Sequence, residues 1–255
     1  MLSQILEAAD RRAAIADSDI DRHRSAATVA APPRSFIDAL RSPGLSVIAE
    51  IKRRSPSAGA IATDLDPAGL AVAYQAGGAD AISVLTEPEF FGGSLDDLTA
   101  VRAAVSVPVL RKDFTRSSSQ IWEARAAGAD AVLLIVAALT DQALVEMLAT
   151  ASKARMAAIV EAHTVDEARR AVGVGAQIIG VNNRDLTTFE VDLGVAERVA
   201  QVLPPSAVTI GESGVSNLEG AQRMERAGYD AILVGEALVR GDDPALLVAS
   251  LKAQR

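Results

Sequence analysis

The sequence predicts an α/β protein in which eight strand–helix units close into a (βα)8 barrel. The length of 255 residues is close to the roughly 250 residues of such a barrel. Apolar runs alternate with helical stretches along the chain. A repeat also recurs: a glycine ends a helix and opens an apolar run at Gly78, Gly128, Gly175 and Gly228, at intervals of 50, 47 and 53 residues. A period near 50 residues is too long for one strand–helix unit and fits two.

The eight expected strands are residues 47–52, 81–86, 107–114, 131–137, 157–162, 178–182, 208–213 and 231–235. Helical patterns separate them, for example at residues 66–75, 120–127 and 141–154. This alternation implies a parallel sheet with right-handed crossovers. Eight units favour a closed barrel, and an open, doubly wound sheet is the structural alternative.

The first 46 residues precede the barrel. Helical patterns at residues 2–18 and 35–41 flank a break at Pro32-Pro33. We expect one domain over residues 1–255, with residues 1–46 as an N-terminal helical extension and 47–255 as the barrel.

Composition excludes several classes of protein and site. The net charge of −8 argues against a nucleic-acid or membrane partner, because either favours a basic surface. The absence of cysteine excludes disulfides and thiolate metal sites, and two histidines cannot form a His-rich metal site. The first ten residues do not resemble a signal peptide, and no apolar run approaches the roughly 18 residues of a membrane span. We therefore expect a cytoplasmic protein, either a monomer or a weak homodimer.

Ionisable residues recur at the ends of the odd-numbered strands. Each of these strands has an apolar residue and, two places later, an ionisable one: Glu50, Lys112, Glu161 and Glu212, with Lys52 continuing the first strand. Side chains two residues apart share a face, and barrel active sites lie at strand C-termini. We therefore expect the five to converge at the C-terminal mouth. The alternative, a purely structural ion network, is costly to assemble.

The loops supply candidate contacts for an anion. Glycine turns follow the last two strands at Ser213-Gly214 and Gly235-Glu236, where barrels recurrently bind phosphate through backbone N–H groups. The Glu236 carboxylate is compatible with phosphate only if it turns outward. After the sixth strand, Asn182 is expected to face the mouth, and Arg184 is a further cation.

Other polar residues have simpler interpretations. The loop after the first strand, with Ser55 and Pro56, could fold over an anionic ligand, whereas Arg53 and Arg54 are interpreted individually as solvated. His163 is expected to make local hydrogen bonds in a loop, and Asp113 to point outward. His23 is expected on the surface and Trp122 in packing.

The motifs together resemble the indole-3-glycerol-phosphate synthase family. The resemblance runs from about Ser35 to Leu247 and is carried by residues 47–57, 110–114, 160–163, 180–186, 212–215 and 233–238. It implies closure, decarboxylation and dehydration of 1-(2-carboxyphenylamino)-1-deoxyribulose 5-phosphate to indole-3-glycerol phosphate, in tryptophan biosynthesis. No metal or organic cofactor is implied. The resemblance also places the N-terminal extension, including the apolar face of residues 35–41, near the active-site mouth.

The resemblance also implies roles for individual residues. Lys112 is similar to the general acid and Glu161 to the acid/base partner for dehydration. Glu50 and Lys52 resemble residues that assist proton transfer and hold the substrate carboxylate, with Ser55 and Pro56 beside them. Asn182 and Glu212 resemble orienting residues, and the phosphate grip corresponds to Ser213, Gly214, Gly235 and Glu236. Gly211 departs from the expected Ala, and Glu236 stands where some relatives have Ser.

Two other functions stay open at this point. One is another phosphate-binding barrel enzyme such as a phosphoribosylanthranilate isomerase, which would use a cysteine that this chain lacks. The other is a non-catalytic phosphosugar-binding barrel, which would need the glycine turns but not Lys112 and Glu161.

Overall fold

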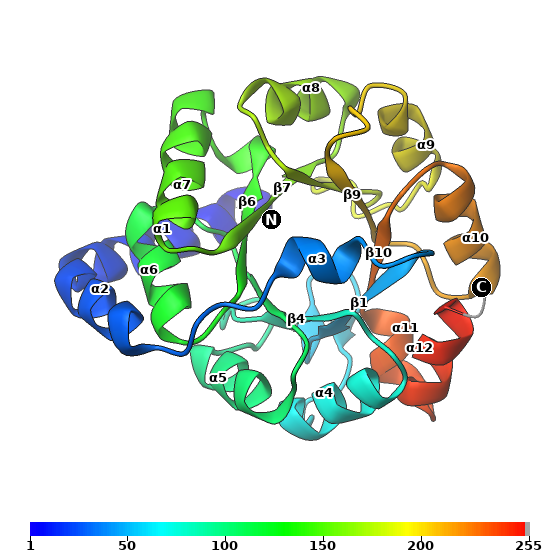
Figure 1. The fold of residues 1–255 in the computed structure, drawn as a ribbon, viewed down its shortest axis with the longest axis horizontal. Coiled ribbons are helices and arrows are strands. Elements are labelled where there is room, and N and C mark those ends of the chain that lie inside the picture. Colours follow the sequence, from blue (N-terminus) through cyan, green and yellow to red (C-terminus); the bar gives the residue numbers. More distant parts are fainter. Residues whose placement is uncertain (253–255) are drawn as a thin grey trace.

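The computed structural model describes residues 1–252 and shows eight parallel strands closed into a barrel (Figure 1). Each strand pairs with the next, and the last pairs with the first. The barrel strands are β1 (Ser46–Ile51), β4 (Ala81–Leu85), β5 (Val109–Lys112), β6 (Ala131–Ile135), β7 (Ala157–Ala162), β8 (Ile178–Asn182), β9 (Val208–Glu212) and β10 (Ala231–Val234). The predicted fold class is thus confirmed, and the open sheet is excluded.

Some strand boundaries differ from those expected. The third strand was expected over residues 107–114, but β5 covers only Val109–Lys112, because Pro108 has no N–H to donate to a neighbouring strand. The fourth was expected to reach residue 137, but β6 ends at Ile135 and a 3-10 turn, η1 (Val136–Ala138), follows. The apolar run continues there because the turn is itself partly buried.

Helices surround the barrel between successive strands. Side chains of Asp66, Ser94, Thr140, Thr164 and Asn217 accept the first free N–H groups of five of them, as N-caps commonly do. The helices are α4 (Pro67–Ala76), α5 (Leu95–Ala104), α6 (Ser118–Ala126), α7 (Asp141–Lys153), α8 (Val165–Gly173), α9 (Gly194–Ala200), α10 (Leu218–Arg226), α11 (Glu236–Arg240) and α12 (Pro244–Lys252). The loop after β1 contains a small hairpin of β2 (Arg54–Ser55) and β3 (Gly59–Ala60).

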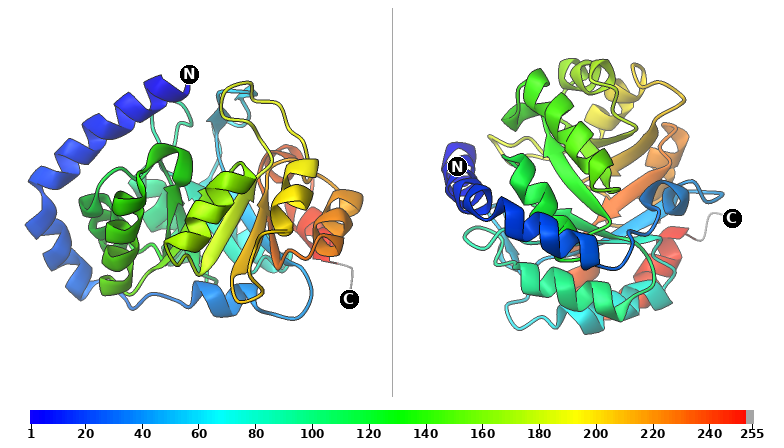
Figure 2. Two further views of the ribbon diagram at one scale, coloured as in Figure 1. Left: turned by 90° about the horizontal axis from the view of Figure 1, so that it is seen from above. Right: turned by 60° about the vertical axis from the view of Figure 1, so that its left-hand side comes forward.

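The N-terminal extension reaches both ends of the barrel. It consists of α1 (Leu2–Ser18), as expected, α2 (Ile20–Val29), which was not expected, and α3 (Phe36–Leu40). In the left view of Figure 2, the beginning of α1 lies at the same end of the barrel as the β2–β3 hairpin, and α3 lies at the opposite end. Ser46, the first residue of β1, donates from its hydroxyl to the Leu40 carbonyl. The expectation that residues 35–41 lie near the mouth is therefore wrong.

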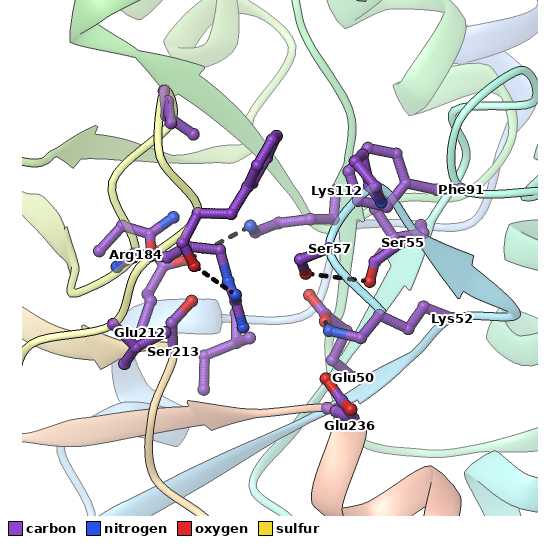
Figure 3. Close-up of a pocket in the computed structure, with 18 of the residues that line it drawn as sticks. Glu50, Lys52, Ser55, Ser57, Phe91, Lys112, Arg184, Glu212, Ser213 and Glu236 are labelled. Atoms are coloured by element: carbon purple, nitrogen blue, oxygen red, sulfur yellow. Dashed lines mark hydrogen bonds and ion pairs between the residues drawn. The ribbon is translucent and has the colours of Figure 1, made fainter. Parts of the chain in front are cut away.

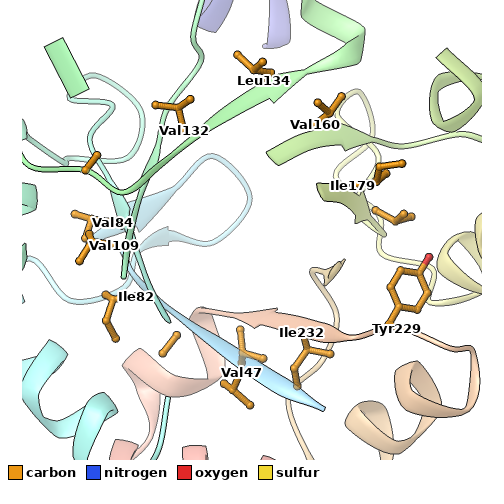
Figure 4. Packing of buried hydrophobic residues seen from close by; sticks show 14 of the residues in the cluster. Val47, Ile82, Val84, Val109, Val132, Leu134, Val160, Ile179, Tyr229 and Ile232 are labelled. Atoms are coloured by element: carbon orange, nitrogen blue, oxygen red, sulfur yellow. The ribbon is translucent and has the colours of Figure 1, made fainter. Parts of the chain in front are cut away.

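Apolar residues form two layers with the alternation that a barrel requires. One set fills the barrel interior and includes Ile48, Leu110, Ile159 and Ile210. Their strand neighbours point outward and pack under the surrounding helices, as Figure 4 shows. The labelled members are Val47, Ile82, Val84, Val109, Val132, Leu134, Val160, Ile179, Tyr229 and Ile232. The same alternation sets the direction in which the polar side chains at the strand ends point.

In three of the four glycine repeats, an aspartate two residues after the glycine has a structural role at the bottom of the barrel. The carboxylates of Asp80, Asp130 and Asp230 accept N–H groups from β1, β5 and β9 at 2.8, 2.7 and 2.7 Å. These contacts lie at the N-terminal ends of the strands, where barrel residues serve stability rather than catalysis. Within residues 1–252, no helix is both long and apolar enough to cross a membrane.

Candidate active site

A cavity of about 570 Å³ opens at the C-terminal ends of the barrel strands. Every residue that the sequence nominates for the site lines it, as Figure 3 shows for several of them. These residues are Glu50, Lys52, Ser55, Pro56, Lys112, Glu161, Asn182, Arg184, Glu212, Ser213, Gly214, Gly235 and Glu236. Barrel closure therefore brings together residues that are up to 186 positions apart (236 − 50).

Lys112 lies between two carboxyl groups in the cavity. Its Nζ atom is 3.3 Å from Oε2 of Glu161 on β7 and 3.3 Å from Oε2 of Glu212 on β9. Burial opposes the charge of Lys112, but Glu161 and Glu212 raise its pKa above the ordinary value. The side chain is therefore an ammonium group at neutral pH and can donate a proton or a hydrogen bond.

The two carboxyl groups differ in protonation because their surroundings differ. Burial opposes the charge of Glu161, but Lys112 and then His163 hold its pKa well below the usual range. Burial raises the pKa of Glu212, and the charge of Glu161 adds to this rise although Lys112 opposes it. Close carboxyl groups titrate as a pair. Glu161 is thus the ionised member and Glu212 the one that holds a proton more readily.

A glycine on β8 makes room for Glu212. A Cβ atom at Gly180 would lie 2.1 Å from Oε1 of Glu212, a distance that two non-bonded atoms cannot adopt. Gly180 shares a face with Ile178 and Asn182. Sequence reasoning did not single it out, although a glycine at an inward-facing position beside ionisable strand ends is a usable signal.

A second ion pair lies on β1 and in the residue that follows it. Lys52 Nζ donates to Oε1 of Glu50 at 2.8 Å. Burial opposes the charge of Glu50, but Lys52 and Lys112 lower its pKa overall. A Cβ atom at Gly235 would lie 2.5 Å from the Glu50 Oε1 atom and 3.1 Å from Lys52 Nζ. Glycine at this position therefore makes space for the Glu50–Lys52 pair.

The loops after β9 and β10 lie next to one another because their strands are paired. Ser213 and Gly214 both have positive φ values, 62° and 87°, so the backbone turns tightly at this point. The Asn183 amide donates to the carbonyls of Glu212 and Ser213 and holds the turn. Glu236 lines the cavity and forms an ion pair with Arg240, also on α11, at 3.1 Å. The arginine therefore offsets the negative charge of this carboxylate.

Part of the cavity wall is apolar and aromatic. Phe91 and Phe114 face each other with ring centroids 6.3 Å apart, and α1 contributes Leu2 and Ile5. Further apolar residues of the lining are Leu133, Ile135, Leu186, Phe189 and Leu233. Such a cavity, apolar with a few convergent polar groups, suits a ligand with an aromatic part and anionic ends. No motif in the sequence identified the aromatic wall.

His163 does more than make the local contacts expected of it. Its Nδ1 atom pairs locally with Oε2 of Glu167, but its Nε2 atom lies 3.3 Å from Oε1 of Glu161. Sequence reasoning missed this second contact. The signal was available, because His163 lies two residues after Glu161 and can share its side of the chain.

Three further residues differ from expectation. Arg53 forms a two-point ion pair with Asp97 rather than projecting into solvent. His23, expected on the surface, is buried. Gly211, where Ala was expected, contacts α10, and a Cβ atom there would be 2.9 Å from the Met224 sulfur.

Asp113, which was expected to point outward, is buried just past the end of β5 and also belongs to the cavity lining. It accepts hydrogen bonds from Arg12 at 3.0 Å and from Thr86 at 2.7 Å. Arg12 also contacts Glu87, at 2.9 Å. These contacts fasten α1 over the strand that bears Lys112.

The fold and the site define a (βα)8-barrel enzyme whose acid–base groups lie at the strand ends. In residues 1–252, no group of three or more His, Asp and Glu side chains is arranged to hold a metal ion. Two solved structures share this fold at low sequence identity. A thiamine phosphate pyrophosphorylase from Pyrococcus furiosus has a TM-score of 0.60 at 18% identity, with 81% of this chain and 93% of that chain covered. An N-acetylmannosamine-6-phosphate 2-epimerase from Clostridium perfringens has a TM-score of 0.62 at 14% identity, with 80% and 90% covered.

Sequence comparison identifies the family. The family model for indole-3-glycerol phosphate synthase matches residues 2–251. An indole-3-glycerol phosphate synthase of Mycobacterium avium is 54% identical over 256 residues, covering 98% of this chain and 93% of that protein. A relative of the same name from Mycobacterium tuberculosis strain H37Rv is 53% identical over 253 residues, with 98% and 93% covered. The chain belongs to the indole-3-glycerol phosphate synthase family.

Proposed function

We propose that this protein is an indole-3-glycerol phosphate synthase, a carboxy-lyase of tryptophan biosynthesis. It converts 1-(2-carboxyphenylamino)-1-deoxyribulose 5-phosphate to indole-3-glycerol phosphate and releases carbon dioxide and water. Lys112, placed 3.3 Å from both Glu161 and Glu212, is the observation that carries this proposal. The two alternatives, a phosphoribosylanthranilate isomerase and a non-catalytic phosphosugar-binding barrel, do not require a buried ammonium group at this position.

In the proposed mechanism, Lys112 starts ring closure. The aromatic carbon that bears the carboxylate attacks the ribulose carbonyl, and Lys112 protonates the carbonyl oxygen. Glu161 and Glu212 keep Lys112 charged until that moment, as the raised pKa of Lys112 indicates. A general acid that is held within a water-poor cavity can accelerate such a step by about 10²–10⁴-fold.

Decarboxylation and dehydration follow on the same substrate. Loss of carbon dioxide restores the aromatic ring and needs no proton from the protein. Dehydration requires a proton for the leaving hydroxyl group and removal of one from carbon. Glu161 is proposed as the acid/base group of this step. Its Oε1 atom accepts a hydrogen bond from the Asn182 amide at 3.4 Å, which orients the carboxylate.

The remaining residues are proposed to bind the substrate. Lys52 holds the anthranilate carboxylate, with Glu50 assisting proton transfer and Ser55 and Pro56 beside it. Arg184 is a further cation in the cavity wall. Backbone groups of the Ser213-Gly214 and Gly235-Glu236 turns are proposed to grip the phosphate. The aromatic ring of the substrate is placed against Phe91 and Phe114.

The test is to mix the purified protein with the substrate and record the appearance of indole fluorescence. We expect the signal to rise to a plateau that matches the substrate added, with indole-3-glycerol phosphate identified by mass. A folded protein that gives no product would refute the proposed function. A cytoplasmic location and a monomeric or weakly dimeric state stay predictions, and sedimentation of the protein tests the second.

A further inference from the structure

The proposed reaction consumes one proton in each turnover. The carbonyl oxygen and the leaving hydroxyl group each receive a proton, and one proton is removed from carbon. The substrate carboxylate leaves as neutral carbon dioxide, so its negative charge must be balanced by one proton from outside. In the proposed mechanism the substrate fills the cavity between the catalytic residues and the open mouth. A separate proton route to the cavity floor would therefore help catalysis.

Glu161 has such a route on the side away from Lys112. Its Oε2 atom faces Lys112, and its Oε1 atom lies 3.3 Å from Nε2 of His163. The other ring nitrogen of His163 lies 3.3 Å from Oε2 of Glu167. Glu167 also accepts the His163 backbone N–H at 2.7 Å, which fixes the two residues relative to each other.

This chain of contacts crosses the barrel wall. Glu161 is in the wall of the cavity, whereas neither His163 nor Glu167 is among the residues that line it. Glu167 is in the first turn of α8, and its side chain is 20% exposed. The three residues therefore connect the cavity to the outer surface without passing through the mouth.

The imidazole is charged at rest, and Glu161 can accept its proton once Lys112, the largest influence that lowers the pKa of Glu161, has given up its own proton. Burial opposes its protonation, but the contacts with Glu161 and Glu167 raise the pKa of His163 to about 10. Both ring nitrogens consequently bear a proton at neutral pH. Arg170 on α8 and Asp185 in the loop after β8 are the further charged groups that act in this region, the first on Glu167 and the second on His163.

We propose that His163 and Glu167 form an inlet through which the proton consumed in each turnover reaches Glu161 from solvent. This inference rests on the proposed function. The Nε2–H bond of His163 breaks as an O–H bond forms on Oε1 of Glu161, which leaves a neutral imidazole with its proton on Nδ1. Rotation of the whole side chain then brings the vacant Nε2 atom to Glu167, where a solvent proton restores the imidazolium. The net transfer is one proton from solvent to Glu161.

The test compares His163→Ala, His163→Gln and Glu167→Gln with the unchanged enzyme. Glu197→Gln is the matched control, because Glu197 forms a similar ion pair with Arg223 and does not line the cavity. We expect kcat of both His163 variants to fall at least about tenfold, since they lose a proton-transfer group, with KM nearly unchanged. Glu167→Gln should lower kcat less, and the control should leave it unchanged.

Added imidazole separates proton delivery from a purely structural role. It should restore kcat of His163→Ala in a saturable manner, leave His163→Gln low because glutamine occupies the space, and leave the control unaffected. Full kcat in His163→Gln would overturn the inlet, because glutamine keeps polar contacts but cannot carry a proton. A folded His163→Ala variant whose lowered kcat does not respond to imidazole would also overturn it. If the unchanged enzyme makes no indole product, the proposed function fails instead.

Discussion

Replacement of Lys112 tests the core of the mechanism. Lys112→Ala removes the proposed general acid and should lower kcat by about 10²–10⁴-fold, which corresponds to about 2.7–5.4 kcal/mol of activation free energy. The phosphate turns are on β9 and β10, whereas Lys112 is on β5. Affinity for the phosphate end of the substrate should therefore change little.

The structure also bounds the effect of this change on stability. Removal of Lys112 takes the cation from its position 3.3 Å from both Glu161 and Glu212. Breaking a buried ion pair typically costs about 3–5 kcal/mol when the remaining charge cannot adapt. Here the pKa of Glu212 is already above its ordinary value, so this group can take up a proton and lower the cost. We expect destabilisation below that range.

The assay is the rate of indole fluorescence at saturating substrate, with thermal unfolding measured on the same samples. Lys112→Met is the matched control for packing, because it keeps an unbranched side chain without the charge, and it should be as inactive as Lys112→Ala. Lys112→Arg should restore little activity, since a guanidinium keeps the charge but donates its proton poorly. An active Lys112→Arg enzyme would make Lys112 an electrostatic anchor and Lys52 the better candidate for the acid. Loss of stability in step with activity would support the structural ion network instead.

Four further predictions follow from the geometry. Gly180→Ala should lower kcat more than it changes KM, because the added Cβ would lie 2.1 Å from Glu212 Oε1 and must displace that carboxyl group; wild-type kinetics would show that its position is unimportant. Gly235→Val should raise KM sharply in a folded protein, because the side chain meets Glu50 at 2.5 Å and enters the proposed phosphate region; an unchanged KM would move the phosphate elsewhere. Deletion of α1 (Leu2–Ser18) should raise KM more than it lowers the melting temperature, since this helix supplies part of the apolar cavity wall; intact activity would contradict that role. Folding raises the pKa of His163 from 6.5 to about 10, so its contribution to stability is complete below pH 6.5 and is lost as pH rises through 10. Denaturant unfolding should show that the difference in stability between the enzyme and His163→Gln decreases over that range. A constant difference would argue against the raised pKa.

Sequence patterns were sufficient to predict the barrel and the direction in which its main polar side chains point. The glycine repeat marked where helices end and strands begin, and the apolar alternation set which residues face inward. Because side chains two apart on a strand share a face, Glu50, Lys112, Glu161 and Glu212 could be assigned to one mouth before any coordinates were known. All strands of a parallel barrel have their C-terminal ends on the same side. A position near the C-terminal end of its strand was therefore enough to assign each of these residues to the mouth.

The alternation could not predict the protonation of the site or the contacts between distant segments. Protonation of Glu161 and Glu212 depends on distances between residues of different strands, because charges interact through space and burial is a property of the closed barrel. The same holds for the second contact of His163 and for the space that Gly180 leaves for a carboxyl group. The position of α3 at the bottom of the barrel, and of α1 at its mouth, is set by packing between distant segments. Local periodicity indicates which side a residue faces, but only the closed barrel sets which groups lie within about 3 Å of one another and hence which of them holds the proton.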